Sequence, residues 1–259
     1  MRKMSVAGTF YPAECKEIKR YIQVFDSAIK TEAKKISAKA IISPHAGYVY
    51  SGFTANAAYC LVDAKKIKRV VIIGPSHRVY LKGASVGLYE SYASPCAELT
   101  IDLAYSKNLV ETFDFLSFNP SAHQEHSTET QVPFVEHYFK EVTIVEIVYG
   151  DMETRHLVPL IKSILEDEET FLVMSTDLSH FYDLDRANQL DKVCLDGVSK
   201  LDLQEIEKGC EACGLLGVKA LILASRELGL SSRVIDYRTS YDASSDKSRV
   251  VGYMSALIF

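Results

Sequence analysis

The 259-residue sequence has no apolar run that approaches the ~20 residues needed to cross a membrane. Its first residues, MRKMSVAGTFYP, carry charge but lack the apolar segment of a secretory signal peptide. We therefore expect no membrane association, and we predict a cytoplasmic location.

Concentrated positive charge is also missing. The formal net charge is -5, and the densest basic cluster surrounds Lys65, Lys66, Lys68 and Arg69. That cluster is typical of a solvated helix end before a buried strand. Because nucleic-acid surfaces need clustered Lys and Arg, we expect no nucleic-acid partner. A phosphate-cradling glycine loop and a G-x-S-x-G elbow are absent as well.

Cysteine is present but shows no secreted framework. The six cysteines are Cys15, Cys60, Cys96, Cys194, Cys210 and Cys213. In a chain of this length without a secretion signal, we expect reduced thiols rather than disulfides. Cys210 and Cys213 form a lone C-x-x-C, which disfavours a structural zinc site and leaves a redox pair open. Cys213 precedes a predicted helix, whose N-terminus would lower the thiol pKa and favour thiolate.

The remaining pattern predicts one α/β domain over residues 1–259, because no repeat, low-complexity tract or linker interrupts it. Short apolar, β-branched runs predict strands at 40–43, 69–74, 142–149, 171–176, 234–237 and 250–259. Apolar residues at helical spacing predict helices over 12–29, 54–64, 101–113, 155–165, 185–200 and 214–228. Such alternation indicates a sandwich with a central mixed, largely parallel sheet flanked by helices.

Three predicted strands end in turns that carry a histidine: AIISPHAGYVYSG, VVIIGPSHRVY and FLVMSTDLSHFYD. Ligands bind beyond the carboxyl ends of strands in open α/β sheets. If these strands are parallel neighbours, His45, His77 and His180 converge at one edge. Imidazole is the commonest metal ligand, so His45 and His77 could bind one ion. Alternatively, each is a loop histidine that bonds the backbone.

Asp177 precedes His180 by three residues. Its carboxylate could orient the His180 ring or accept a proton, and a histidine beside a metal but not bound to it is a natural general base. The alternative is that Asp177 caps the following helix and His180 is exposed.

The polar segment SAHQEHSTETQVPF, residues 121–134, offers His123, Glu125, His126, Glu129 and Gln131. By composition it could be a metal cluster. It could equally be a solvated helix start whose acidic residues complement the helix dipole, and composition alone favours this second interpretation. Several tyrosines, Tyr48, Tyr50, Tyr182 and Tyr241, lie near the candidate site in sequence and could bind an aromatic or peptide ligand or simply pack.

Taken together, the motifs SPHAGYVYSG, GPSHR, EHSTETQVPF, STDLSH, ACG and the opening VAGTFYP resemble the Memo family. Its bacterial and archaeal members are called AmmeMemoRadiSam system protein B. The family's fold is similar to that of class III, LigB-type non-haem iron extradiol dioxygenases. The resemblance implies a single α/β domain, and the family's name implies an association with a radical-SAM system partner.

The resemblance also implies site roles. It gives His45, His77 and Cys213 as metal ligands, with Asp177 and His180 in the same pocket. His180 matches the general base of the dioxygenases. By the same resemblance, His126 and Glu129 line or support the pocket, and we place Tyr48 with them.

The implied ligand set departs from the dioxygenases, which hold iron(II) with two histidines and one carboxylate. A thiolate third ligand is softer and oxidisable, so we expect iron(II), with copper or zinc also compatible. The fold and two histidines carry over, whereas catechol cleavage does not.

Four functions compete on this sequence. The first is a metal-dependent, dioxygenase-like oxidoreductase in which His180 moves the proton. The second is a non-catalytic adaptor that binds a small molecule or peptide in the ancestral pocket, as eukaryotic family members are described as signalling adaptors. The third is copper or iron handling without turnover, and a hydrolytic zinc enzyme is the fourth.

Overall fold

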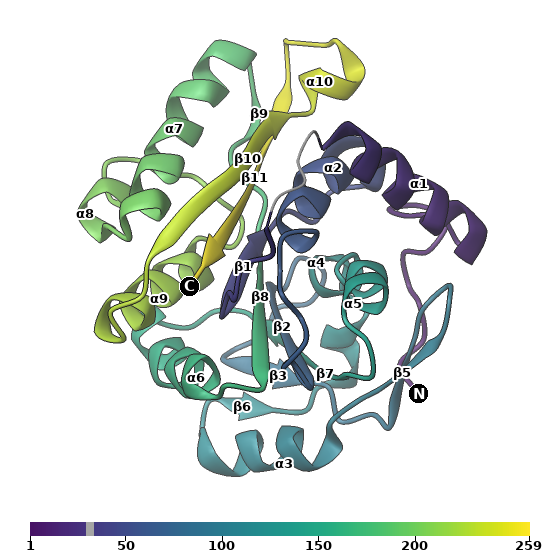
Figure 1. Cartoon of the computed structure of the whole chain (residues 1–259). Coiled ribbons are helices and arrows are strands. Elements are labelled where there is room, and N and C mark those ends of the chain that lie inside the picture. Colours follow the sequence, from purple (N-terminus) through teal and green to yellow (C-terminus); the bar gives the residue numbers. More distant parts are fainter. Residues whose placement is uncertain (30–33) are drawn as a thin grey trace.

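The structure is a computed structural model that describes residues 1–29 and 34–259. In that part of the chain, a nine-stranded mixed sheet is flanked by helices (Figure 1). In sheet order its strands are β10 (Ser232–Thr239), β11 (Val250–Ile258), β1 (Ala40–Ser43), β8 (Thr170–Ser175), β2 (Arg69–Pro75), β7 (Thr143–Tyr149), β3 (Ala84–Val86) and β6 (Leu116–Ser117), with β9 (His180–Tyr182) paired to β11. β4 (Ser91–Ala93) and β5 (Glu98–Thr100) form a separate pair. The predicted α/β class is therefore confirmed.

The centre of the sheet is parallel. β1 pairs with β8, β8 with β2 and β2 with β7, all in parallel. Their residues are almost all buried, which explains why the sequence shows continuous apolar runs rather than alternation. β11 and β3 run antiparallel to their neighbours β1 and β7. The carboxyl ends of the four parallel strands consequently meet at one edge of the sheet.

Successive side chains of each central strand enter opposite cores, because strand side chains alternate between faces. Ala40 and Ile42 of β1 belong to one buried cluster, and Ile41 to the other. The first cluster includes residues of α3 (Leu103–Thr112), α6 (Thr154–Glu166), α7 (Leu184–Lys200), α8 (Leu203–Ile206) and α9 (Leu215–Glu227). The second includes residues of α1 (Cys15–Ala28), α2 (Tyr48–Tyr59) and α5 (Val132–Tyr138). The short helices η1 (Pro120–His123), α4 (His126–Glu129) and α10 (Tyr241–Ser244) lie in connections.

One predicted helix is misplaced. The spacing predicted a helix over 54–64, whereas α2 begins at Tyr48 and ends at Tyr59. α2 is buried around most of its circumference, so no single apolar stripe marks its beginning. Its first amide belongs to Tyr48 and donates to the carbonyl of Phe10 at 2.7 Å, a partner distant in sequence. The earlier start brings α2 directly against the His45 turn.

The prediction of reduced cysteines is wrong for four of the six. The structure joins Cys15 to Cys96 and Cys194 to Cys210, while Cys60 and Cys213 are free. The paired Cα atoms lie 4.5 Å and 4.8 Å apart, inside the range that a disulfide spans. The sequence separations of 81 and 16 residues concealed this proximity. Cys210 therefore pairs with Cys194 rather than with Cys213.

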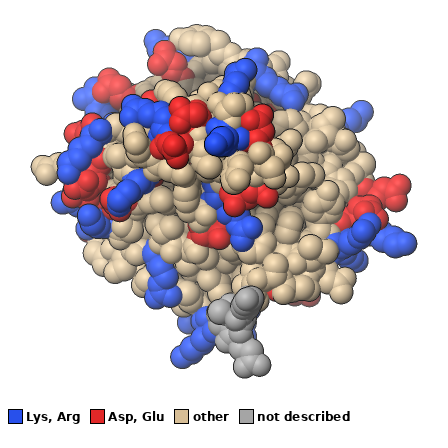
Figure 2. All heavy atoms as spheres, turned by 90° about the horizontal axis from the view of Figure 1, so that it is seen from above, with Lys and Arg blue, Asp and Glu red and all other residues tan. Residues whose placement is uncertain are grey.

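No helix among the described residues is both long and apolar enough to span a membrane. On the face shown in Figure 2, Lys and Arg side chains are interspersed with Asp and Glu side chains.

Candidate metal centre

The candidate site lies where the parallel strands end. His45 follows β1 by two residues and His77 follows β2 by two, and β1 and β2 flank β8 in the sheet. Of the three histidines predicted to converge, His45 and His77 therefore do so, whereas His180 is not among the clustered rings. A third ring joins them from the short helix α4, which begins at His126.

These three imidazoles form a compact cluster. The ring centroid of His45 lies 5.2 Å from that of His77 and 5.3 Å from that of His126. The ring centroids of His77 and His126 are 4.6 Å apart. One ring nitrogen from each residue lies within 4.8 Å of the other two. This spacing suits three ligands that share one metal ion.

The tautomer of His45 follows from its hydrogen-bond partner. Its Nδ1 lies 2.8 Å from the Ser175 hydroxyl. That hydroxyl donates its only proton to the carbonyl of Ser127, so it must accept from His45. Nδ1 of His45 therefore carries the proton, and in the neutral ring Nε2 keeps a lone pair, which faces the Cys213 thiol.

Glu125 fixes the other two rings in the same way. One oxygen of its carboxylate lies 3.2 Å from Nδ1 of His77 and 2.8 Å from Nδ1 of His126. A carboxylate accepts hydrogen bonds only, so both Nδ1 atoms carry protons, and each Nε2 would offer a lone pair when its ring is neutral. Although burial alone would raise its pKa, contacts with His126 and His77 hold the pKa of Glu125 well below its usual value.

The cluster has the chemistry of a cation site. In the described residues no hydrogen bond reaches Nε2 of His77 or His126, whereas Nε2 of His45 faces the Cys213 thiol at 3.3 Å. Burial, followed by the repulsion of His77 and His126, lowers the pKa of His45 well below its usual value, so this ring stays neutral. Neutral imidazoles whose Nδ1 protons are held by a carboxylate or hydroxyl are the usual arrangement around a bound metal. The residues therefore fit a metal ion.

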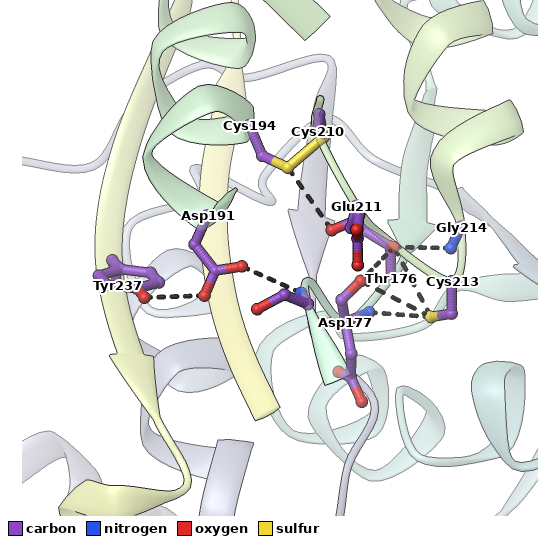
Figure 3. The surroundings of a disulfide bond; sticks show 10 residues. Thr176, Asp177, Asp191, Cys194, Cys210, Glu211, Cys213, Gly214 and Tyr237 are labelled. Atoms are coloured by element: carbon purple, nitrogen blue, oxygen red, sulfur yellow. Dashed lines mark hydrogen bonds between the residues drawn. A yellow bond between two sulfur atoms is a disulfide. The ribbon is translucent and has the colours of Figure 1, made fainter. Parts of the chain in front are cut away.

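Cys213 approaches His45 from the turn before α9 and is not one of the three mutually close ligands. Its Sγ lies 3.3 Å from Nε2 of His45 and accepts the amide hydrogen of Asp177 at 3.2 Å. Figure 3 shows its side chain near Asp177 and Thr176, while the Cys194–Cys210 disulfide lies apart from it. Cys213 is thus placed to be a further ligand beside His45.

The ionisation predicted for Cys213 is wrong for the metal-free protein. A helix start was expected to lower the thiol pKa. Instead burial, with the nearby Asp177 charge second, raises the pKa of Cys213 to about 12. Desolvation of the thiolate outweighs the hydrogen bonds from the Asp177 amide, the Thr176 hydroxyl and the Gly214 amide, which lower the pKa.

Asp177 lies behind His45. Its Oδ1 accepts the His45 amide hydrogen at 2.7 Å, and its Oδ2 lies 4.0 Å from Nε2 of His45. Burial raises the pKa of Asp177 above its ordinary value despite these hydrogen bonds. The carboxylate thus holds the His45 turn and faces the centre, in place of the helix cap considered from sequence.

His180 begins β9 and is partly buried. Its partner in the sheet is Val251 of β11. A cavity of about 380 Å³ is lined by His180, Ser179 and Cys213, among others. This volume suits a small molecule.

Two residues predicted to line or support the pocket point elsewhere. The carboxylate of Glu129 turns away from the rings and binds the N-terminal segment. Tyr48 is 2% exposed, donates its hydroxyl to the carbonyl of Thr130 at 2.9 Å and stacks on Phe134. Both support the loops around the site from behind.

The sequence offered Glu125 only as one member of a possible metal cluster and gave Ser175 no role, although both residues contact Nδ1 atoms of the rings. The only signal for Glu125 was its position directly before His126 in an acidic segment, which composition assigned to solvent. In the structure Glu125 is 1% exposed.

The family profile and the similar curated proteins all carry descriptions of the same family. The sequence profile of the family described as "Memo-like protein" matches residues 2–257. A "MEMO1 family protein" of Methanobrevibacter smithii is 30% identical, covering 99% of each chain. Another of the same description, from Aquifex aeolicus, is 29% identical over 99% of this chain and 98% of its own. An uncharacterized Escherichia coli K12 protein has a similar fold, with a TM-score of 0.53 at 12% identity, over 85% of this chain and 99% of its own.

Proposed function

Because this chain belongs to the Memo family, we propose that it is a metal-binding protein whose ion is held by His45, His77 and His126, with Cys213 as a fourth donor. The supporting observation is that each Nδ1 of the three rings lies beside an acceptor, the Ser175 hydroxyl or the Glu125 carboxylate, with the Cys213 thiol 3.3 Å from Nε2 of His45. An imidazole whose Nδ1 proton is held in this way can bind a cation through its Nε2 when the ring is neutral.

We favour iron(II) and the chemistry of a small-molecule oxidoreductase. A ferrous ion would supply Lewis-acid and one-electron redox chemistry at this centre. The chain supplies the rest: the cavity beside His180 admits the substrate, and the His180 imidazole takes up or returns a proton. Asp177 holds the His45 backbone in place through its Oδ1.

The decisive test is elemental analysis of protein prepared without oxygen. We expect stoichiometric iron in the native chain and its loss in His45→Ala and His126→Ala. His156→Ala is the control, since His156 is exposed and packs near Phe115 rather than near the site. Retention of metal in His126→Ala would remove His126 from the ligand set. Absence of metal from every preparation would favour a pocket that binds an organic or peptide ligand.

Metal handling without turnover is a second candidate, favoured by the thiol 3.3 Å from His45. A sulfur donor prefers copper(I) or zinc over harder ions. If delivery is the function, Cys213→Ser should weaken copper(I) binding far more than iron(II) binding, and His180→Ala should leave both unchanged. If oxidoreduction is the function, His180→Ala should stop turnover while the metal stays bound.

A further inference from the structure

The N-terminal segment, residues 2–11, lies beside the metal centre, and most of its anchoring contacts are made by one carboxylate, that of Glu129. Glu129 is 0% exposed and lies at the last residue of α4. Its oxygens accept the amide hydrogens of Ser5 and Val6, each at 2.8 Å, and the hydroxyl of Tyr11 at 2.8 Å. One side chain thus binds the segment at both ends of its central turn.

Arg2 adds an ion pair to the same anchor. Its guanidinium contacts Glu129 and lies 3.5 Å from Glu146 of β7, while its Cζ lies 4.7 Å from the centre of the Tyr92 ring. Arg2 is 3% exposed. Burying three charges costs about as much as their attraction returns, so such a network is weak evidence for stability alone. The network of Arg2, Glu129 and Glu146 does hold the N-terminal segment in a defined position relative to α4.

Between Val6 and Tyr11 the chain turns through Gly8, whose φ of +81° is accessible to glycine at little cost. The turn presents Phe10 to the metal centre. The Phe10 ring lies 4.6 Å from the His126 ring, and the Phe10 carbonyl accepts the Tyr48 amide just beyond the His45 turn. The segment therefore contacts the surroundings of two of the three imidazoles.

Helix α4 has little capacity to place His126 by itself. It has four residues, too few for a helix that is stable alone. Glu125 restrains His126 at Nδ1, which still allows the ring to tilt about that contact. Phe10 packs against the ring and limits this motion.

We propose that Glu129 is a positioning residue for His126, acting through the segment Arg2–Tyr11, which seats Phe10 against the imidazole and fixes the direction of its lone pair. This inference rests on the proposed metal function. It gives the buried Arg2–Glu129 network a role in the site.

The test is anaerobic titration of the full chain with Co²⁺, whose affinity and visible absorption both report the ligands. Phe10→Ala and Glu129→Gln should each weaken Co²⁺ binding about 10-fold, the smaller end of the range for losing a residue that orients a metal ligand. Each substitution should also shift the Co²⁺ absorption bands. The matched control is Phe115→Ala, which removes another partly buried phenylalanine that packs near a histidine, His156. It should change neither quantity.

A double-mutant comparison separates positioning from general loosening of the fold. In a His126→Ala background, Phe10→Ala should produce no further loss of Co²⁺ affinity, because its effect passes through His126. An equal loss in both backgrounds would overturn the inference, as would a Phe10→Ala protein with native affinity and spectrum. Failure of the native chain to bind Co²⁺ would overturn the proposed function and this inference together. Phe10→Ala keeps the test decisive if Glu129→Gln does not fold.

Discussion

At the scale of single residues, Glu125 has the largest predicted effect among residues that do not bind the ion. Glu125→Gln keeps the shape of the side chain but replaces an acceptor by an amide that can point an N–H at one ring. We expect a loss of metal affinity of about 10- to 100-fold, the usual consequence of losing an orienting carboxylate. Isothermal titration with Zn²⁺ would measure it, with Glu153→Gln, an exposed substitution, as control. Unchanged affinity would mean that Glu125 does not set the ring tautomers.

The sequence predicted two of the three clustered histidines as metal ligands, but not His126. His45 and His77 were predictable because each directly follows a buried strand, and such strands can share an edge. His126 was assigned a supporting role, since a polar run reads the same whether it faces solvent or a buried carboxylate. Burial decides between the two, and the burial of Glu125 depends on chain segments far away in sequence.

At the scale of elements, the central strands were predicted nearly residue by residue because they are buried on both faces. The short strands β3, β6 and β9 were not predicted. Each has only two or three residues and forms by pairing with a neighbouring strand. Its sequence is therefore too short to show the alternation of apolar and polar residues that marks a strand. A helix start in the segment of α4 was considered, but as a solvated one, whereas Ser127 is buried and its hydroxyl donates to the carbonyl of Pro75.

The packing of α4 on β2 gives a second prediction. Gly74 lies near the end of β2, and a Cβ there would come within 2.6 Å of the Ser127 hydroxyl and 3.1 Å of the Thr128 methyl carbon. Gly74→Ala should therefore displace α4, lower the free energy of unfolding by about 1–3 kcal/mol and weaken metal binding through His126.

Chemical denaturation and Co²⁺ titration would measure the two effects. Gly87→Ala is the control, because a Cβ at that position meets no atom closer than 3.4 Å. A Gly74→Ala protein that is less stable but binds Co²⁺ normally would separate the position of α4 from the metal site.

At the scale of the whole molecule, two internal links join segments that are distant in sequence. The disulfide Cys15–Cys96 joins the start of α1 to the connection between β4 and β5. The carboxylate of Glu146, on β7 in the middle of the chain, binds Arg2 near the N-terminus and also His123 and Thr128. Neither link leaves a local pattern in the sequence, so both were beyond prediction.

The second link makes the stability of the whole chain sensitive to acid. Burial alone would raise the pKa of Glu146, but the positive charge of Arg2, with His123 and the Thr128 hydroxyl, lowers it from 4.5 to about 2. A depressed carboxyl pKa stabilises the folded state fully above the unfolded pKa, and this contribution is lost as the pH falls through the folded pKa. We therefore expect the free energy of unfolding to fall between about pH 4.5 and pH 2, with roughly 3 kcal/mol of the loss due to Glu146.

Urea denaturation of the native chain and of Glu146→Gln across this pH range would measure the contribution. The native chain should be the more stable at pH 7, and the difference between the two proteins should shrink steadily toward pH 2, because the protonated native side chain and glutamine are both neutral. Parallel curves would contradict the prediction. The carboxyl chemical shift of Glu146, followed by NMR in the native chain, provides an independent value of its pKa and needs no folded variant. A midpoint near 4.5 would mean that Arg2 does not bind this carboxylate in solution, and the anchor proposed for the N-terminal segment would then depend on Glu129 alone.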